Sequence, residues 1–244
     1  MDPFTTRLAR LAGTISDGGI ASRRLTIGRI RNYAPRSDIA CAGEPPRAVR
    51  VVVSGWACRY KLVPDGRRQI LALLLPGDVC DGHDGLDEID HTIGALSAVV
   101  LGEVDPAAYT VAVRTDDRIG QTLRRMVSIE AAIQREWTFN VARRDTREGL
   151  AHLFCELYHR LDAIGLVDGG GYAMPLTQIE LADALGGTPV HVNRILQVLR
   201  RERLLVLTKR RLAIPDLRAL EGVALFDPAY LHQYTTAATG MAKS

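Results

Sequence analysis

The chain has 244 residues, of which 47% are hydrophobic and 24% are charged, and its formal net charge is +3. These are the proportions of an ordinary soluble protein with one large or two moderate domains. No apolar run reaches the roughly 20 residues that a membrane-spanning helix needs, and the N-terminal residues lack the apolar core of a signal peptide. We therefore exclude a membrane partner and expect a cytoplasmic protein.

Residues 1–45 give few signals, and we expect a short helix there followed by one or two strands. From residue 49 the pattern is typical of β-structure, with strands expected at 49–53, 56–63 and 69–75 and shorter ones at 92–93, 95–101 and 103–104. Turn-forming residues separate the first three strands at positions 54–55, 64–66 and 76–78. Many short strands between residues 25 and 113 predict an antiparallel β-barrel or jelly roll, and we assign residues 1–115 to this barrel domain.

The segment 78–91 is acidic, and no Lys or Arg lies between Arg68 and Arg114. It carries many oxygen and nitrogen ligands: Asp81, His83, Asp84, Asp87, Glu88, Asp90 and His91. On a jelly roll, such ligands are compatible with a metal-dependent cupin enzyme or a metal sensor, and haem bound through His83 or His91 is a variant. The simpler interpretation is a solvated acidic loop, because a cupin needs a second His on a distant strand and none follows His91 before His152.

The hydrophobic period becomes helical after Asp116, and we assign residues 116–144 to a dimerisation helix. Its apolar residues fall at two heptad positions and form the predicted dimer interface: Ile119, Leu123, Met126, Ile133 and Trp137. A single helix that joins two domains cannot bury such a stripe alone, so we expect a second copy, related by two-fold symmetry, to cover it. The alternative is that the stripe packs against the chain's own barrel.

Residues 145–244 are assigned to a C-terminal domain. Asp145 or Thr146 is expected to cap a helix that ends near Gly165, and residues 169–171 are predicted to be a flexible linker. The next helix has an apolar side formed by Ile179, Leu181, Ala182 and Leu185. Two glycines at 186 and 187 can turn the chain, Thr188 can cap the following helix, and Pro189 suits its first position.

This second helix, up to residue 201, has two different faces. Its apolar face consists of Val192, Ile195, Leu196 and Leu199, and its opposite face of Val190, Asn193, Arg194, Gln197, Arg200 and Arg201. Two helices around a tight turn, the second with a basic face, predict a helix-turn-helix that binds double-stranded DNA. Strands at 204–207 and 212–214 are predicted to flank a basic wing tip, where Lys209, Arg210 and Arg211 would contact phosphates.

A β-barrel, a long helix and a winged helix-turn-helix in this order resemble the Crp/Fnr superfamily of transcription regulators. The resemblance covers about residues 25–215 and is most specific at 55–70, 75–78 and 176–204. It implies an activator that binds a pseudo-palindromic operator as a homodimer and contacts RNA polymerase. Since the chain contains no nucleophile–base arrangement and no Gly-rich phosphate loop, we predict that it is not an enzyme.

The resemblance also implies roles for single residues. Arg194 stands where members of the superfamily place an Arg that grips guanine, and Asn193 could pair with adenine. Val190 replaces a Glu that accepts a hydrogen bond from cytosine in several members, so contact with a thymine methyl group is expected instead. The residues predicted to contact the DNA backbone are Thr177, Gln178, Thr188, His191, Gln197, Lys209 and Arg210, although His191 could equally pack against the turn.

The sensor domain departs from the superfamily's best-known members. The segment after Gly77 contains neither the Glu nor the Arg with which some members bind cyclic AMP. No cysteine precedes Cys41, and Cys58, Cys80 and Cys155 form no Cys-x-x-Cys pair, so an iron–sulfur cluster is not expected either. We therefore expect no cofactor, and a regulator controlled by abundance or by cysteine oxidation is an alternative to an effector-binding one.

Overall fold

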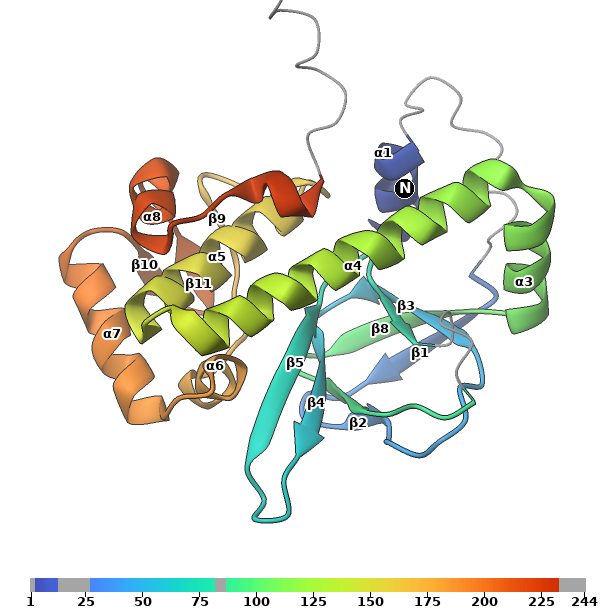
Figure 1. The fold of residues 1–244 in the computed structure, drawn as a ribbon, viewed down its shortest axis with the longest axis horizontal. Coiled ribbons are helices and arrows are strands. Elements are labelled where there is room, and N and C mark those ends of the chain that lie inside the picture. The colour runs from blue at the N-terminus through green and yellow to red at the C-terminus, as the bar shows by residue number, and fades with distance from the viewer. Residues whose placement is uncertain (1–2, 13–26, 82–86, 233–244) are drawn as a thin grey trace, which may run out of the picture.

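Two four-stranded antiparallel sheets form a barrel in the N-terminal half of the computed structural model, which describes residues 3–12, 27–81 and 87–232. One sheet contains, in spatial order, β1 (Arg29–Tyr33), β8 (Val99–Val104), β3 (Val49–Ser54) and β6 (Val79–Asp81). The other contains β2 (Asp38–Ala40), β7 (Thr92–Ala95), β4 (Ala57–Leu62) and β5 (Arg68–Leu74) (Figure 1). The predicted antiparallel barrel is thus confirmed.

The barrel interior is filled by β-branched and other apolar residues such as Val52, Ile93 and Leu101, which are completely buried. A tight turn at Gly55 joins β3 to β4. Its φ of +80° lies in the left-handed region, and a Cβ there would come within 2.1 Å of the Ala98 carbonyl oxygen, so only glycine fits. This turn carries the chain from a central strand of one sheet to a central strand of the other.

Three helices follow or flank the barrel. α1 (Pro3–Ala12) lies against the long helix α4 (Asp117–Arg143) and β3. Residues 106–115, predicted to belong to the strand-forming region up to residue 113, instead form the helix α3 (Pro106–Thr115). The correction has a local cause, because Asp105 caps this helix by accepting a hydrogen bond from the Ala108 backbone N–H at 3.0 Å and Pro106 occupies its first turn.

The predicted dimer interface on α4 is wrong at the level of residues. All of its five members are buried within a single chain, each at most 6% exposed: Ile119, Leu123, Met126, Ile133 and Trp137. The first three pack with Phe4 and the barrel residues Val49 and Val51, while the last two join a core shared with the C-terminal domain. The structure shows the alternative, in which the stripe packs on the chain's own barrel. The apolar side of α4 and an apolar side of the barrel cover each other.

The C-terminal part combines helices with a small sheet of spatial order β10-β11-β9. Its elements are α5 (Thr146–Asp162), β9 (Gly171–Ala173), α6 (Gln178–Leu185), α7 (Pro189–Arg201), β10 (Val206–Thr208), β11 (Arg211–Ala213), α8 (Leu217–Ala224) and η1 (Pro228–Leu231). The predicted linker at residues 169–171 is wrong, because Gly171 begins a strand that pairs with β11. Gly169 and Gly170 form the turn before it, with φ of +52° and +70°.

The barrel and the C-terminal domain share one apolar core. Trp56 of the barrel stacks on Tyr172 of β9 with ring centroids 6.5 Å apart, and Leu73 and Phe154 belong to the same cluster. The division into residues 1–115, 116–144 and 145–244 therefore stays a prediction, since the core runs across its boundaries. Throughout residues 3–12, 27–81 and 87–232, no helix combines the length and apolar character that crossing a bilayer requires.

Candidate nucleic-acid interface

The helix-turn-helix is defined by two N-caps and one left-handed glycine. Thr177 caps α6, and its hydroxyl and the Glu180 carboxylate each accept a hydrogen bond from the other residue's backbone N–H, at 3.2 and 2.6 Å. Gly186 ends α6 with φ of +67°, and Thr188 caps α7 by accepting from the His191 N–H at 3.3 Å. The predicted turn at residues 186–187, the Thr188 cap and the start of the second helix at Pro189 are confirmed. Both cap hydroxyls keep a proton that can be donated to a phosphate.

The exposed face of α7 is the one predicted from its period. Val192 and Leu199 are completely buried, whereas the opposite side is open to solvent: Val190, Asn193, Arg194, Gln197, Arg200 and Arg201. Val190 is 82% exposed, so its side chain is accessible to a ligand. The expectation for Ile179 of α6 is wrong: it is 60% exposed and lines a cleft of about 410 Å³ between α6 and the barrel.

Two residues of α7 with predicted base contacts already have side-chain partners. Arg194 donates from Nη2 to His191 Nδ1 at 3.1 Å, one helical turn away. Asn193 accepts at Oδ1 from Gln178 Nε2 of α6 at 3.1 Å. Sequence reasoning placed Gln178 on the phosphates and His191 either there or against the turn, and it missed these contacts. The i, i+3 spacing of His191 and Arg194 was the available signal for one of them.

The wing strands begin and end closer to the tip than predicted, because Leu204 and Leu205 are buried before β10 starts. At the tip, Lys209 and Arg210 are exposed and adopt φ of +49° and +60°. The wing contacts α7 through a hydrogen bond, since Arg200 Nη2 donates to the Leu207 carbonyl of β10 at 3.0 Å. Arg211, by contrast, donates to the Asp168 carbonyl and is therefore turned away from the role predicted for it.

The acidic residues near this surface are paired with other groups of the same chain. Asp183 accepts from Arg68 of β5 at 2.8 Å, and Glu202 accepts from Arg147 of α5 at 2.6 Å. Glu180 is buried in its capping box. The exposed charges of α7 and the wing tip are consequently cationic, which favours a polyanionic ligand.

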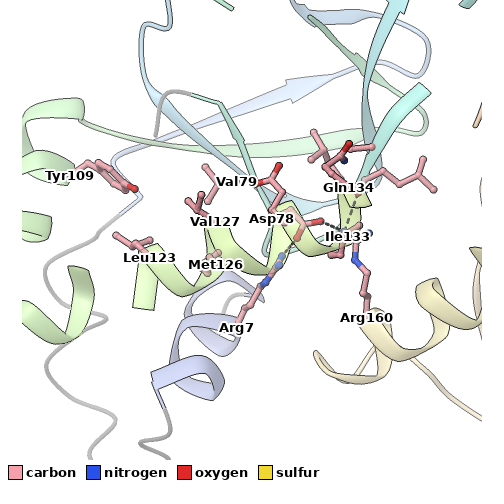
Figure 2. A pocket seen from close by; sticks show the side chains of 14 residues that line it. Arg7, Asp78, Val79, Tyr109, Leu123, Met126, Val127, Ile133, Gln134 and Arg160 are labelled. Carbon is pink, nitrogen blue, oxygen red and sulfur yellow. Dashed lines mark hydrogen bonds and ion pairs between the residues drawn. The ribbon is translucent and has the colours of Figure 1, made fainter. Parts of the chain in front are cut away.

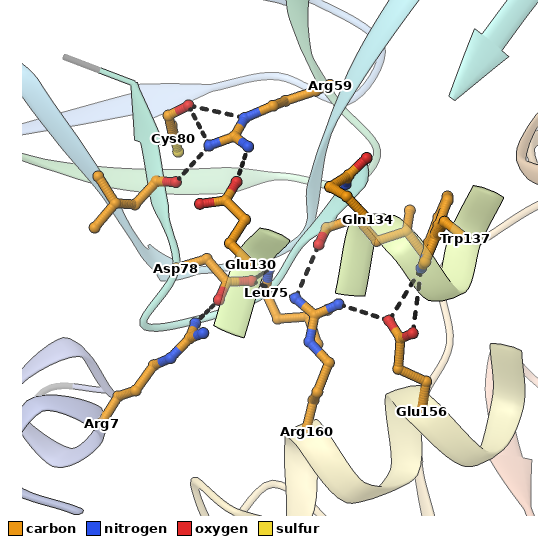
Figure 3. Close-up of polar contacts among 12 residues, drawn as sticks. Arg7, Arg59, Leu75, Asp78, Cys80, Glu130, Gln134, Trp137, Glu156 and Arg160 are labelled. Carbon is orange, nitrogen blue, oxygen red and sulfur yellow. Dashed lines mark hydrogen bonds and ion pairs between the residues drawn. The ribbon is translucent and has the colours of Figure 1, made fainter. Parts of the chain in front are cut away.

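A buried ion-pair network connects the barrel to α1, α4 and α5 (Figure 3). Asp78, in the turn at 75–78, accepts from the Leu75 N–H at 2.6 Å and from Arg160 of α5 at 2.7 Å, and pairs with Arg7 of α1. Arg160 also donates to Glu156, which is completely buried, at 3.0 Å. Sequence reasoning missed this network, although two opposite charges at i and i+4 on an apolar helix face were a signal.

A small cavity lies beside the network, between barrel, α1 and α4 (Figure 2). Its volume of about 40 Å³ is enough for a water molecule but not for a nucleotide. Arg7 and Arg160 reach its rim from two different helices. Burial, together with the charge of Arg160, lowers the pKa of Arg7 to about 9. The cavity is therefore too small for a large ligand, and the ion pairs beside it hold the barrel against α1, α4 and α5.

The acidic segment gives no support to a metal site where the structure describes it. His83 and Asp84 lie outside the described residues. Asp81 is buried and receives a hydrogen bond from Arg50 at 2.6 Å, and Asp90 lies 2.7 Å from His91 and 3.1 Å from Lys61. Within residues 3–12, 27–81 and 87–232, no group of three or more His, Cys, Asp or Glu residues could hold a metal ion.

Three of the four cysteines are buried, and only Cys41 is exposed. Burial raises the pKa of Cys58 and of Cys80 to about 12 and raises that of Cys155 as well. Because the thiolate is the reactive form, these three thiols are poor targets for oxidants at neutral pH. This favours a structural role for them.

Comparison with known proteins covers both halves of the chain. Residues 30–116 match the model of the cyclic nucleotide-binding domain, and residues 149–223 match that of the Crp-like helix-turn-helix domain. The transcriptional activator protein FnrL of Cereibacter sphaeroides is 29% identical over 78% of each chain. The transcriptional regulator LdrP of Thermus thermophilus is 28% identical over 79% of this chain and 95% of its own.

Among solved structures, FixK2 from Bradyrhizobium japonicum has a TM-score of 0.73 and 26% identity, covering 80% of this chain and 96% of that one. The family models, the relatives and the solved structure all agree with a helix-turn-helix domain, in which α7 exposes its basic face. The prediction of a DNA-binding regulator that is not an enzyme is confirmed, and the chain belongs to the Crp/Fnr superfamily of transcription regulators.

Proposed function

We propose that the protein binds a pseudo-palindromic operator as a homodimer, with α7 of each copy in the major groove. The observation that carries this proposal is the exposed face of α7, where Val190, Asn193 and Arg194 stand together without competing acidic groups. Two-fold symmetry would place the two helices about 34 Å apart, one turn of the DNA helix. By analogy with the activator FnrL, we propose that the dimer activates transcription in the cytoplasm through contact with RNA polymerase.

The three residues differ in what they can recognise. Arg194 can donate two parallel hydrogen bonds to guanine O6 and N7, and Asn193 can donate to and accept from adenine. Val190 can only make apolar contact, for which the thymine methyl group is the available partner. The predicted backbone contacts Thr177, Thr188, Gln197, Lys209 and Arg210 would then supply affinity that does not depend on sequence.

Replacing Arg194 with alanine is expected to weaken specific binding by about 1–3 kcal/mol and to relax the preference for one base pair. Lys209→Ala is the matched control, since loss of a phosphate contact should weaken binding to all sequences and reduce the salt slope by about 1. Both are measured by titrating variants with duplexes enriched from a random DNA pool, at several salt concentrations. If Arg194→Ala kept the wild-type base preference, this face of α7 would not be the reading surface.

We propose that the dimer forms through the outward face of α4 rather than through its buried stripe. Residues spaced alternately by four and three positions lie along one side of α4 and are called here the outer seam: Val127, Ala131, Gln134, Thr138 and Val141. All of them are exposed except Gln134, which is half-buried and donates to the Leu71 carbonyl of β5 at 3.1 Å. Val127 and Val141 are 47% and 51% exposed. Such spacing is that of a coiled-coil contact, and its small residues would let two copies of α4 approach closely.

Val127→Glu is expected to raise the dissociation constant of the dimer at least about tenfold, because two-fold symmetry would bury the new carboxylate from both copies at the seam without a cation. Val111→Glu is the control, since Val111 is equally apolar and 58% exposed but lies on α3. Sedimentation equilibrium of both variants gives the two constants. Equal dissociation constants for the two variants would remove α4's outer seam as the interface.

We further propose that the barrel uses no cyclic nucleotide as an effector. The space between β4, β5 and α4, about 340 Å³, is lined by the acidic residues Asp90 and Glu130. Arg59, a cation in this space, already pairs with Glu130 and donates to the Val79 and Cys80 carbonyls at 3.1 Å. A cyclic phosphate would have to displace the Glu130 carboxylate, which disfavours its binding.

A further inference from the structure

Each of the two residues proposed to hydrogen-bond to bases is held by a neighbouring side chain. We propose that His191 and Gln178 are positioning residues, which orient Arg194 and Asn193 toward base edges, rather than contacts to phosphate. This inference rests on the proposed reading surface of α7. It assigns to two residues a role in sequence discrimination without any contact to a base.

His191 acts on Arg194 within one turn of α7. Since a guanidinium has no acceptor, the contact of 3.1 Å between Arg194 Nη2 and His191 Nδ1 requires the imidazole to accept. The histidine backbone N–H is bound to the Thr188 cap, and its side chain is half-buried, so the ring stands on the rigid first turn. One of the five guanidinium N–H groups is used, and enough remain for two parallel bonds to guanine.

Gln178 acts on Asn193 across the two helices. It lies in the first turn of α6, whose start is fixed by the capping box of Thr177 and Glu180. Its amide Nε2 donates to Asn193 Oδ1 at 3.1 Å, which selects one orientation of the asparagine amide. Both N–H groups of Asn193 and the second lone pair of its oxygen stay available, as adenine recognition requires.

The physical gain is pre-organisation. A long exposed side chain loses rotamer freedom when it binds, and this loss reduces affinity for the matching base. A side chain held in place before binding loses less. Removing the holding residue should therefore weaken binding to the preferred duplex more than binding to a mismatched one.

The experiment uses the full-length protein and duplexes that the wild type enriches from a random pool, together with single-base variants of them. We expect His191→Ala to reduce discrimination at the guanine read by Arg194 about tenfold, within the range of one bidentate contact, with an unchanged salt slope. His191→Gln keeps an acceptor and should restore most of the discrimination. His191→Lys, which can donate to a phosphate but cannot accept, should not restore it.

A double-mutant cycle tests the coupling directly. In the Arg194→Ala background, His191→Ala should change affinity less than about twofold, because there is no side chain left to position. Gln178→Ala should behave in the same way toward Asn193→Ala at the adenine position. Circular dichroism of each variant verifies that the helices are intact.

Several results would overturn the inference. One is full discrimination in His191→Lys, and another is a His191→Ala variant that loses affinity equally for every duplex with a salt slope smaller by about 1, as a phosphate contact predicts. If Arg194→Ala loses discrimination while His191→Ala does not, only the positioning role fails. If Arg194→Ala itself has no effect, the proposed reading surface fails and the positioning role with it.

Discussion

Replacing Arg160 with methionine is expected to lower the free energy of unfolding by about 3–5 kcal/mol, the cost of breaking a buried ion pair by removing one partner. Arg160 lies between Asp78 and Glu156, at 2.7 and 3.0 Å, and its side chain is 9% exposed. Methionine retains much of the aliphatic stem but supplies no cation. The donors left to the completely buried Glu156 among the described residues would be neutral: Trp137 Nε1 at 3.2 Å and the Tyr230 hydroxyl at 3.0 Å.

The control is Arg147→Met on the same helix. Arg147 pairs with Glu202 at 2.6 Å, but the two side chains are 36% and 42% exposed, so we expect a loss of about 0–1 kcal/mol. Urea unfolding of both variants at one fixed protein concentration measures the two losses, since association would otherwise change the apparent stability. A loss below about 1 kcal/mol for Arg160→Met would mean that the buried pairs contribute no more than surface pairs do.

Stability is also expected to fall as the pH drops below about 6.5, because His152 cannot be charged in the folded state. It is 1% exposed, and its ring packs against those of Phe226 and Tyr230, with centroids 5.0 and 5.9 Å away. Burial, together with the nearby charge of Arg144, lowers its pKa from 6.5 to about 3. Glu136 lies 3.5 Å from Nε2 but is shared with Arg144 at 3.1 Å, which neutralises it.

The direction in which stability changes with pH follows from proton binding. Between pH 3 and 6.5 the unfolded chain carries a proton on this histidine and the folded chain does not, so acid favours unfolding. At pH 5 this single group should lower the free energy of unfolding by about 2 kcal/mol relative to pH 7.5. Urea unfolding at a series of pH values measures the dependence.

His152→Phe, which preserves a ring in the aromatic cluster, should flatten the pH dependence between 7.5 and 5 by that amount. His232→Asn is the control, because His232 is exposed and its left-handed φ of +50° suits asparagine. The control should keep the wild-type pH dependence. An unchanged dependence in His152→Phe would show that acid acts on other groups.

The local features of the reading surface were predictable because short-range chemistry decides them. Thr177, Thr188 and Gly186 cap or end their helices through bonds to residues no more than four positions away. The side of α7 that faces solvent follows from its period, with Val192 and Leu199 inward and Asn193 and Arg194 outward. The side-chain contacts that hold Asn193 and Arg194 depend on rotamers and on the crossing of two helices, so no period predicts them.

By itself, the sequence determined that a barrel, a long helix and a winged helix-turn-helix follow one another, because alternation, helical period and caps depend on near neighbours along the chain. Only the tertiary structure decided what the apolar stripe of α4 contacts, since a stripe indicates burial but not its partner. The same holds for residues 169–171, which become a strand because β11 offers a pairing edge. The tertiary structure also decided that Arg160 and His152 are buried, since their burial depends on elements that are distant in the sequence.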